Sequence, residues 1–367
     1  DYNVPIKNNI ILSTKRIDES LKTIRYILSK NPKQLIIISH LGRPNMYDKK
    51  LSLLLVRDYL QKKMKETIYF IERVENISNQ KVILLENIRF YPEETKNLTT
   101  TQLFRNKLSN LGNVYINDAF GCCHRGHSSI IGINTTEKYM GFLLSKEINY
   151  LENSLSNPGV KSLILGGSKV GDKIKLIENL IPKVDNILIG GGMAFTFLKY
   201  NNINIGNSLL DSDNLINIPK IFKSAKKYKT NIILPVDFLC NDSFSNEGNI
   251  KTFNIESGIK DNFIGMDLGN KTIDLFKNYI DNSNLIICNG PMGVFEFKNF
   301  SNGSRELLKC ISNVKNCVKV IGGGDIVSCC ETFNYSKYMD HVSTGGGASL
   351  KLLEGKSLPG VKFLLEK

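Results

Sequence analysis

The stretch SLILGGSKVGDK, from Ser162 to Lys173, decides the fold. An apolar run typical of a buried strand ends there in two glycines, and two lysines follow. Glycine lets the backbone turn tightly and brings its N–H groups close to a ligand, and a helix that begins there adds the positive end of its dipole. The stretch therefore predicts a strand, a loop and a helix that together bind an anion.

Three further glycine clusters follow apolar runs in the same half of the chain. They are NILIGGGMAF (Asn186–Phe195), VKVIGGGDIV (Val318–Val327) and HVSTGGGASL (His341–Leu350). One such loop is a weak signal. Four of them in one half of a chain indicate an anionic ligand, and a nucleotide is the first candidate.

Strand-like apolar runs alternate with helical segments along the whole sequence. In the first half they are QLIIISH (Gln34–His40), KVILLEN (Lys81–Asn87) and NVYINDAF (Asn113–Phe120). The second half continues with SLILGG, NILIGGG, TNIILPVDF (Thr230–Phe238), NLIICNG (Asn284–Gly290) and VKVIGGG. Such runs predict an α/β fold whose parallel sheets are covered by helices on both faces. Ligands of such sheets bind at the carboxyl ends of the strands.

The glycine clusters do not match the common nucleotide-binding motifs. Gly166 and Gly171 have the spacing of a P-loop, but Asp172 and Lys173 replace its Lys-Ser/Thr pair, and no cluster reads GxGxxG. Lys169 and Lys173 lie one helical turn apart, so both can face one triphosphate. Asp325 follows a glycine triplet, where a carboxylate can hold Mg²⁺ that phosphates bridge. A solvated lysine pair and an ordinary helix cap are equally open interpretations.

Basic residues follow the strands of the first half. His40 and Arg43 come after the first run, Arg89 after the second, and Arg125 after the third. Arginine binds phosphate and carboxylate through a planar, permanently charged fork. Each arginine alone is more often a surface ion pair, but the repeated position predicts a basic anion pocket.

Composition narrows the class of protein. The 367 residues carry 48 Lys and Arg against 35 Asp and Glu, a formal net charge of +13. This excess favours either polyanionic partners or, as we expect, lysines spread over solvated helix faces. Two cysteine pairs, Cys122–Cys123 and Cys329–Cys330, form no disulfide framework or zinc motif, so we expect reduced thiols. No apolar run approaches the roughly 18 residues that span a membrane.

The length and the change in motif chemistry predict two domains. We expect a first domain over residues 1–144 and a second over 159–349. A helix over 145–158 connects them, since Ile148, Leu151 and Leu155 share one face and Asn157, Pro158 and Gly159 stop it.

The ordered set of motifs resembles the phosphoglycerate kinase family. The motifs are DYNVP, SHLGRP, ENIRF, NDAFG, HRGHSS, GGSKVGDK, GGGMAFTF, PVDF, NGPMGVFE, GGGD and HVSTGGGASLKLLEG, and they span nearly the whole chain. The resemblance implies two domains of three layers (α/β/α), one for phosphoglycerate and one for the nucleotide, which close by hinge bending. It also implies that the tail over 350–367 packs back on the first domain.

The resemblance implies a role for individual residues. The phosphoglycerate set is Asp1, Tyr2, Asn3, Arg16, Ser39, His40, Gly42, Arg43, Arg89, His124 and Arg125. The nucleotide set is Gly167, Ser168, Lys169, Lys173, Gly191, Gly265, Met266, Gly290, Met292, Phe295, Glu296, Gly324, Asp325 and Ile326. The catalytic set is Arg16, Lys169, Gly324 and Gly347, and Asp325 is the metal ligand.

The implied activity is reversible phosphoryl transfer from 1,3-bisphosphoglycerate to Mg-ADP, which gives 3-phosphoglycerate and ATP in carbon metabolism. We expect a monomer in the cytoplasm, with the plastid stroma as the alternative, and no membrane or nucleic-acid partner. The chain departs from the family where Ile326 replaces Thr, Cys288 replaces Trp, and Cys122–Cys123 replace Thr-Ala. The family's first strand would precede Asp1, so we expect a fragment or processed start. A catalytically impaired binding protein of the same fold is the alternative.

Overall fold

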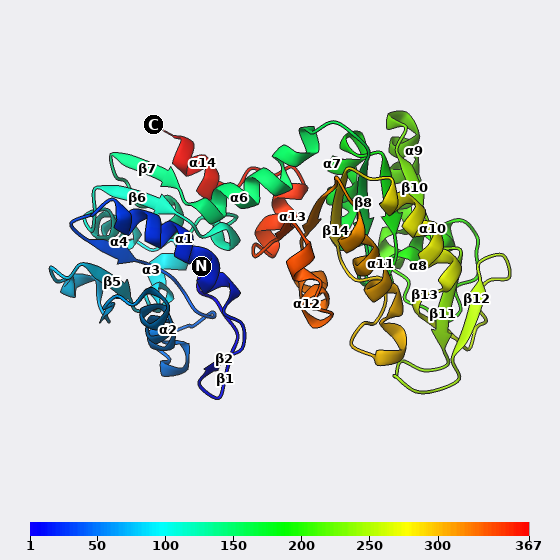
Figure 1. The fold of residues 1–367 in the computed structure, drawn as a ribbon, viewed down its shortest axis with the longest axis horizontal. Helices are drawn as coiled ribbons and strands as arrows, with labels where there is room; N and C mark the ends of the chain where they lie inside the picture. Colours follow the sequence, from blue (N-terminus) through cyan, green and yellow to red (C-terminus); the bar gives the residue numbers. More distant parts are fainter. Residues whose placement is uncertain (367) are drawn as a thin grey trace. The chain divides into compact units, whose positions relative to one another are not determined.

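The computed structural model describes residues 1–366, which divide into two compact units. The first unit contains residues 1–148 and the tail from Ser357, and the second contains residues 149–356. Helices and strands alternate in both (Figure 1), which confirms the predicted α/β class.

The strands of the first unit form two parallel sheets and one hairpin. Strand β5 (Val82–Leu85) lies between β3 (Leu35–Ile37) and β4 (Tyr69–Ile71), and β6 (Val114–Asn117) pairs with β7 (Glu137–Met140). The hairpin joins β1 (Ile6–Lys7) to β2 (Ile10–Ile11) in antiparallel pairing.

Helices cover both faces of the sheet that contains β5. On one face, Val82 and Leu84 belong to a core with buried side chains of the first two helices, and on the other face Ile83 and Leu85 join a core with Phe104. Because successive strand residues point to opposite faces, an uninterrupted apolar strand buries both. The helices of this unit are α1 (Lys15–Ser29), α2 (Leu54–Met64), α3 (Pro92–Thr95), α4 (Thr101–Ser109), α5 (Ser128–Ile131) and α14 (Pro359–Leu365).

The tail of the chain belongs to the first unit. Helix α14 packs on α5 and β7, and the backbone N–H of Gly360 donates to the carbonyl of Cys123 at 2.9 Å. The ring of Phe363 lies 4.1 Å from Lys138 Nζ. Helix α13 (Gly347–Leu353) instead packs on α7 (Ile174–Leu180) of the second unit.

The main sheet of the second unit is parallel throughout. Its order is β10-β9-β8-β14-β15-β16, with bounds β8 (Lys161–Leu165), β9 (Asn186–Ile189), β10 (Asn231–Ile233), β14 (Leu285–Asn289), β15 (Val318–Ile321) and β16 (His341–Val342). From β8 the chain continues to β9 and β10 on one side of the sheet, and from β14 it continues to β15 and β16 on the other side. The carboxyl ends of β8 and β14 therefore form a topological switch point. Ligands of open α/β sheets bind at such a point.

A second sheet of this unit is antiparallel and was not predicted. Strand β11 (Asp237–Asn241) pairs with β12 (Lys251–Asn254) and β13 (Ile264–Leu268). The sequence predicts one strand over Thr230–Phe238, but the structure divides this run between β10 and β11. Pro235 lies between them, and proline has no N–H for a sheet hydrogen bond.

The remaining helices of the second unit connect these strands. They are α8 (Ala194–Tyr200), α9 (Ile218–Tyr228), α10 (Asn270–Asp281), α11 (Asn302–Asn313) and α12 (Gly324–Thr332). Helix α6 (Phe142–Leu151) contains the division between the units and is followed by a 3-10 turn over Asn153–Ser156, where the sequence predicts one helix over 145–158. Within the described residues, 1–366, no helix has the length and apolar character to cross a bilayer.

Candidate functional site

The loop after β3 meets the first three residues of the chain. The N–H of Tyr2 donates to Ser39 Oγ at 2.8 Å, and the N–H of Gly42 donates to Asn3 Oδ1 at 2.8 Å. The predicted motifs DYNVP and SHLGRP, 37 residues apart in sequence, are therefore joined directly.

Charged groups line this junction. Arg16, in the first turn of α1, donates from Nη1 to the carbonyl of Asn3 at 2.6 Å and lies 3.8 Å from Asp1 Oδ2. His40 Nδ1 lies 3.8 Å from Asp1 Oδ1. Burial lowers the pKa of His40 to about 2, and the positive charge of Arg89 adds to this effect, so the imidazole is neutral at physiological pH.

Arg89 is held by a residue that sequence reasoning missed. Its Nη1 donates to the carbonyl of Gly42 at 2.6 Å, while its backbone N–H donates to Asn87 Oδ1 at 3.1 Å. Asn87 is 1 % exposed and donates from Nδ2 to the carbonyls of Leu41 and Leu51. The asparagine in ENIRF was the available signal, because a buried amide beside a functional arginine needs partners.

The other predicted arginines contribute positive charge near Arg89. Burial lowers the pKa of Arg89, and the charges of Arg125 and Arg43 lower it further. Arg43 is exposed and Arg125 half-buried. The pKa of the nearby His127 is lowered mainly by burial, and the charge of His124 lowers it further. A cluster of cationic groups of this kind is typical of a pocket for an anion.

Glu94 fixes the loop that carries His124 and Arg125, and no pattern in the sequence predicts this role. It is 3 % exposed, and it accepts hydrogen bonds from the N–H and Oγ of Ser129 at 2.8 and 2.7 Å. His127 Nδ1 lies 3.7 Å from its Oε1. Burial raises the pKa of Glu94 to about 7, although the hydrogen bonds from Ser129 act in the opposite direction.

In the second unit, glycine loops approach one another after β8, β9 and β14. The N–H of Gly167 donates to the carbonyl of Pro291 at 2.9 Å, and the N–H of Gly191 donates to the carbonyl of Met292 at 3.1 Å. Gly167, Gly191 and Gly290 have φ of 97°, 62° and 102°. A Cβ on Gly290 would lie 2.3 Å from the carbonyl oxygen of Gly166. The glycines are therefore required for the loops to touch.

Lys173 lies at the centre of this switch point. Its Nζ donates to Asn289 Oδ1 at the end of β14, and Asn289 Nδ2 donates to the carbonyl of Gly322 at 2.6 Å. Burial lowers the pKa of Lys173, while the carboxylates of Asp172 and Asp325 oppose this effect. Asn289 joins three loops and is, after Asn87 and Glu94, the third residue of the candidate site that sequence reasoning missed.

Lys169 has a different environment from Lys173. It is exposed, and a 3-10 turn over Gly171–Lys173 separates it from α7. The predicted helical spacing of the two lysines is therefore wrong. Among the other predicted residues of the nucleotide set, Ser168, Gly324, Asp325 and Glu296 are exposed, as is Gly347 at the start of α13.

The apolar members of the nucleotide set are mostly buried. Met266 and Met292 are each 2 % exposed and Ile326 is 1 % exposed, whereas Phe295 is half-buried. The N–H of Val294 donates to the carbonyl of Met266 at 3.0 Å, which ties the loop after β14 to β13. Gly265 packs against the ring of Phe195, where a Cβ would lie 2.2 Å from Cζ.

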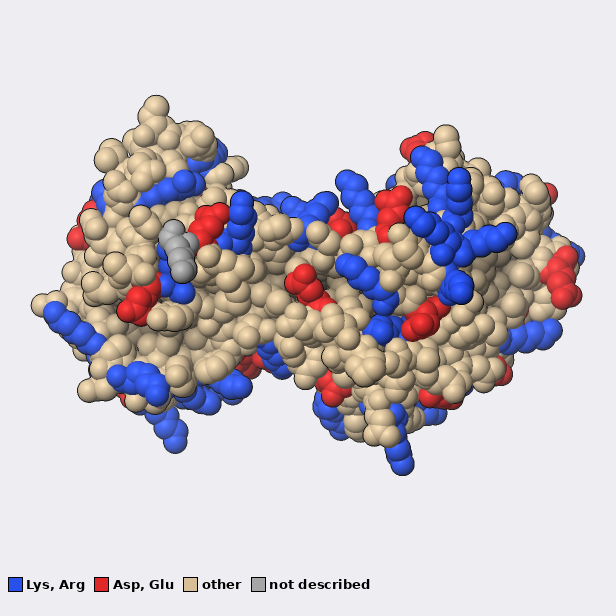
Figure 2. Space-filling model, turned by 90° about the horizontal axis from the view of Figure 1, so that it is seen from above, with Lys and Arg blue, Asp and Glu red and all other residues tan. Residues whose placement is uncertain are grey.

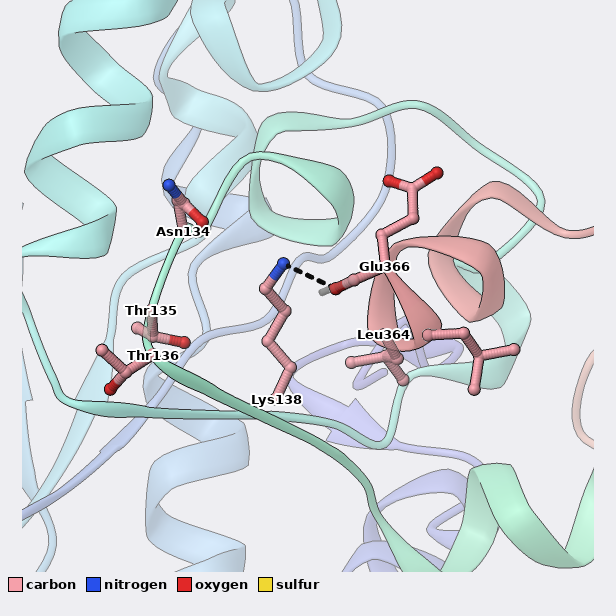
Figure 3. A pocket seen from close by; sticks show the side chains of 7 residues that line it. Asn134, Thr135, Thr136, Lys138, Leu364 and Glu366 are labelled. Carbon is pink, nitrogen blue, oxygen red and sulfur yellow. Dashed lines mark hydrogen bonds between the residues drawn. The ribbon is translucent and has the colours of Figure 1, made fainter.

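Over the described residues, neither the charge on the face shown in Figure 2 nor the hollow beside α14 indicates a different site. On the face in Figure 2, Asp and Glu are interspersed among the more numerous Lys and Arg. A hollow between residues 134–138 and α14 is lined by Lys138, whose Nζ donates to the carbonyl of Glu366 at 3.4 Å (Figure 3). None of its lining residues belongs to a predicted set.

Comparison with known proteins gives one consistent result. A family model described as phosphoglycerate kinase matches residues 1–356. The chain is 44% identical to a phosphoglycerate kinase of Drosophila melanogaster, covering 99% of this chain and 94% of that protein. It is 43% identical to that of Plasmodium falciparum (isolate 3D7), covering 100% and 94%.

A solved structure gives the same result. Phosphoglycerate kinase from Coxiella burnetii superimposes with a TM-score of 0.91 at 34% identity, covering 99% of this chain and 94% of that one.

Proposed function

Because the chain belongs to the phosphoglycerate kinase family, we propose that its two residue sets carry out reversible transfer of the acyl phosphate of 1,3-bisphosphoglycerate to Mg-ADP. The family makes the chain an enzyme, a phosphotransferase with a carboxyl group as acceptor. The observation that carries the residue assignment is the hydrogen-bonded junction of Asn3, Arg16, Gly42 and Arg89.

The first unit binds 3-phosphoglycerate in this proposal. Arginine forks complement both anionic ends of the substrate, its phosphate and its carboxylate. Arg16, Arg43, Arg89 and Arg125 supply permanent charge. His40 is neutral and donates a hydrogen bond without adding charge.

The second unit binds the nucleotide. The glycine loops offer backbone N–H groups at the switch point, and Lys173 reaches the same place from the 3-10 turn Gly171–Lys173. Exposed Lys169 meets the transferring phosphoryl group, and exposed Glu296 meets the ribose. The walls of the nucleotide pocket are formed by Gly265, Met266, Met292, Phe295 and Ile326. Some of these residues contribute only backbone atoms.

The chemistry needs no general base. In the direction of ATP use, the nucleophile is a carboxylate, which is ionised far above its pKa of roughly 3.5. Phosphoryl transfer depends on positioning and on stabilising charge at the equatorial oxygens. We assign this stabilisation to Arg16, Lys169 and the backbone of Gly324 and Gly347.

The residues present fit a magnesium ion that is bound mainly by phosphates. Asp325 is an exposed carboxylate in the first turn of α12, and its field reaches Lys173. Mg²⁺ commonly uses one or two carboxylates together with substrate phosphates. When bound, the ion neutralises charge that develops between the β- and γ-phosphates.

A coupled assay tests the proposal. The full chain, with 3-phosphoglycerate, Mg²⁺ and ATP, should consume ATP at a rate that depends on all three. No consumption above the rate without 3-phosphoglycerate would contradict the proposed function. A monomeric state and a cytoplasmic location are also proposed, and light scattering and cell fractionation measure them.

A further inference from the structure

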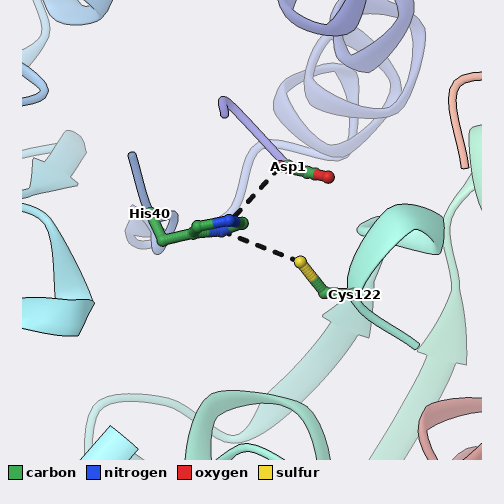
Figure 4. Close-up of side chains that lie close together, drawn as sticks. All are labelled: Asp1, His40 and Cys122. Atoms are coloured by element: carbon green, nitrogen blue, oxygen red, sulfur yellow. Dashed lines mark hydrogen bonds and ion pairs between the residues drawn. The ribbon is translucent and has the colours of Figure 1, made fainter. Parts of the chain in front are cut away.

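Three different metal-binding side chains converge in the first unit. Asp1, His40 and Cys122 lie close together, and each offers one ligand atom within 4.8 Å of the other two (Figure 4). His40 Nδ1 lies 3.8 Å from Asp1 Oδ1 and 3.7 Å from Cys122 Sγ. The resemblance to the kinase family assigns no role to Cys122.

The spacing suits a small tetrahedral ion. Zinc bonds of about 2.0–2.1 Å to nitrogen or oxygen and about 2.3 Å to sulfur place neighbouring tetrahedral ligands roughly 3.3–3.6 Å apart. The separations of His40 Nδ1 from Asp1 Oδ1 and from Cys122 Sγ exceed these by at most about half an ångström, and the ligand atoms of Asp1 and Cys122 lie within 4.8 Å of each other. Small side-chain rotations would therefore complete the three bonds.

We propose that Asp1, His40 and Cys122 form a binding site for a thiophilic divalent cation such as Zn²⁺. The donors are a carboxylate oxygen, the imidazole Nδ1 and a thiolate sulfur. Water or an anion fills the fourth position. The Cys122 thiol releases its proton to solvent as the Zn–S bond forms, and no electron is transferred.

The donor set selects against the magnesium of the proposed reaction. Thiolate and imidazole favour Zn²⁺ and related metals, whereas Mg²⁺ prefers oxygen ligands in octahedral geometry. Millimolar Mg²⁺ in an assay therefore leaves the site to zinc.

Nearby positive charge limits the affinity. Arg16 Nη1 lies 3.8 Å from Asp1 Oδ2, and Arg89 acts electrostatically on His40. Binding of M²⁺ with loss of one thiol proton raises the local charge by one. We therefore expect a reversible, inhibitory site and not a permanently occupied structural one.

Inhibition follows from shared residues. Asp1 and His40 also belong to the proposed phosphoglycerate set, so zinc and the substrate would compete. This second part rests on the proposed function, whereas zinc binding itself does not.

Cys123 provides a matched control. It is the adjacent residue and is equally buried, but its Sγ faces Asn117 Oδ1 at 3.8 Å and the carbonyl of Ala119 at 3.4 Å. A serine at either position changes one sulfur to oxygen. Only the change at position 122 removes the proposed ligand.

The experiment uses Co²⁺ and Zn²⁺ as probes on the full chain. Cys310 and Cys317 are partly exposed, so both are first replaced by serine in the parent protein. Co²⁺ reports a thiolate ligand through a charge-transfer absorption band, and competition with a chromophoric chelator gives the Zn²⁺ affinity.

We expect a band in the parent and in Cys123→Ser, and its loss in Cys122→Ser with at least tenfold weaker zinc binding. A parent without the band, or a band that survives in Cys122→Ser, would overturn the site. Circular dichroism checks that each variant is folded. If Cys122→Ser does not fold, Asp1→Asn serves instead, and it should keep the band but weaken zinc binding; unchanged zinc affinity would reject the site.

The kinase assay separates the two proposals. Zinc should raise the apparent KM for 3-phosphoglycerate in Cys123→Ser and have at least tenfold less effect in Cys122→Ser. If the parent chain binds zinc but has no kinase activity, the proposed function is rejected and the zinc site is supported. Kinase activity without zinc binding would reject the site alone.

Discussion

The first unit presents charged side chains to its proposed ligand, whereas the second unit presents mainly backbone. Arg16, His40 and Arg89 are fixed by hydrogen bonds or ion pairs to neighbouring loops. Gly191 and Gly290 instead bring loops together because they have no side chains. A site of the first kind fails when a charge is removed, and a site of the second kind fails when a Cβ is added.

Lys169→Ala tests the main exception to this comparison. Lys169 is a side chain with a proposed catalytic role in the second unit, which otherwise presents mainly backbone to its ligand. We expect kcat to fall about 10³-fold, or about 4 kcal/mol of transition-state stabilisation, because a cation on the transferring phosphoryl group is lost. The exposed position of Lys169 should leave the melting temperature unchanged. Steady-state kinetics measure this, and a kcat close to that of the parent would remove Lys169 from the catalytic set.

Gly290→Ala tests whether backbone proximity builds the second site. The positive φ and the contact of the new Cβ with Gly166 should together lower the free energy of unfolding by about 2–4 kcal/mol. Gly324→Ala is the matched control for stability, because nothing lies within 4 Å of its Cβ. Urea denaturation compares the two. Equal stabilities would show that the loops tolerate a side chain.

Arg43→Ala tests the charge-built site. Loss of one charge-assisted contact, about 1.5–3 kcal/mol, should raise the KM for 3-phosphoglycerate roughly 10- to 100-fold and leave that for ADP unchanged. Arg57→Ala on α2 is the control, since Arg57 pairs with Asp58 and belongs to no predicted set. A KM unchanged in Arg43→Ala would exclude Arg43 from the pocket.

Glu94→Gln sharpens the comparison through pH. Burial raises the carboxyl pKa in the folded protein from 4.5 to about 7, so the folded state holds the proton more tightly than the unfolded state. The raised pKa of Glu94 therefore stabilises the fold fully below pH 4.5, and this stabilisation is lost as pH rises to about 7. Over this range the free energy of unfolding falls by at most about 1.4 kcal/mol per pH unit.

Glu94→Gln has no titrating carboxyl group and should lack this contribution. The free energy of unfolding of the variant minus that of the parent should therefore rise as the pH increases from 4.5 to about 7. His127 has the opposite shift, to about 4, and remains in both proteins. Glu93→Gln, at the adjacent and less buried position, should behave like the parent. A stability difference that does not change with pH would contradict the assignment.

Local sequence patterns were sufficient for most of the fold. Mainly apolar runs predicted β3, β5, β8, β9, β14 and β15, since strands of a parallel sheet that is covered on both faces have few polar positions. The antiparallel sheet of β11–β13 escaped prediction because its strands are only partly apolar. Pro235 indicates a break after β10, but the pairing of the following strand, β11, with β12 and β13 depends on contacts with segments distant in sequence.

The candidate site divides in the same way. Arg43, Arg89 and Lys173 could be predicted because each directly follows a strand or a glycine loop. Glu94 and Asn289 could not, since each acts on a partner far away in sequence. Glu94 contacts Ser129, and in isolation PEET reads as an ordinary helix start. Asn289 contacts Lys173, 116 positions away.

The docking of α14 on α5 has a consequence for biosynthesis. The first unit needs a helix that is translated only after residues 149–356. Domains usually fold in order during synthesis. Here the second unit can complete its contacts before the first, so the surface of the nascent first unit around Cys123 and Ile130 stays uncovered until α14 has been translated.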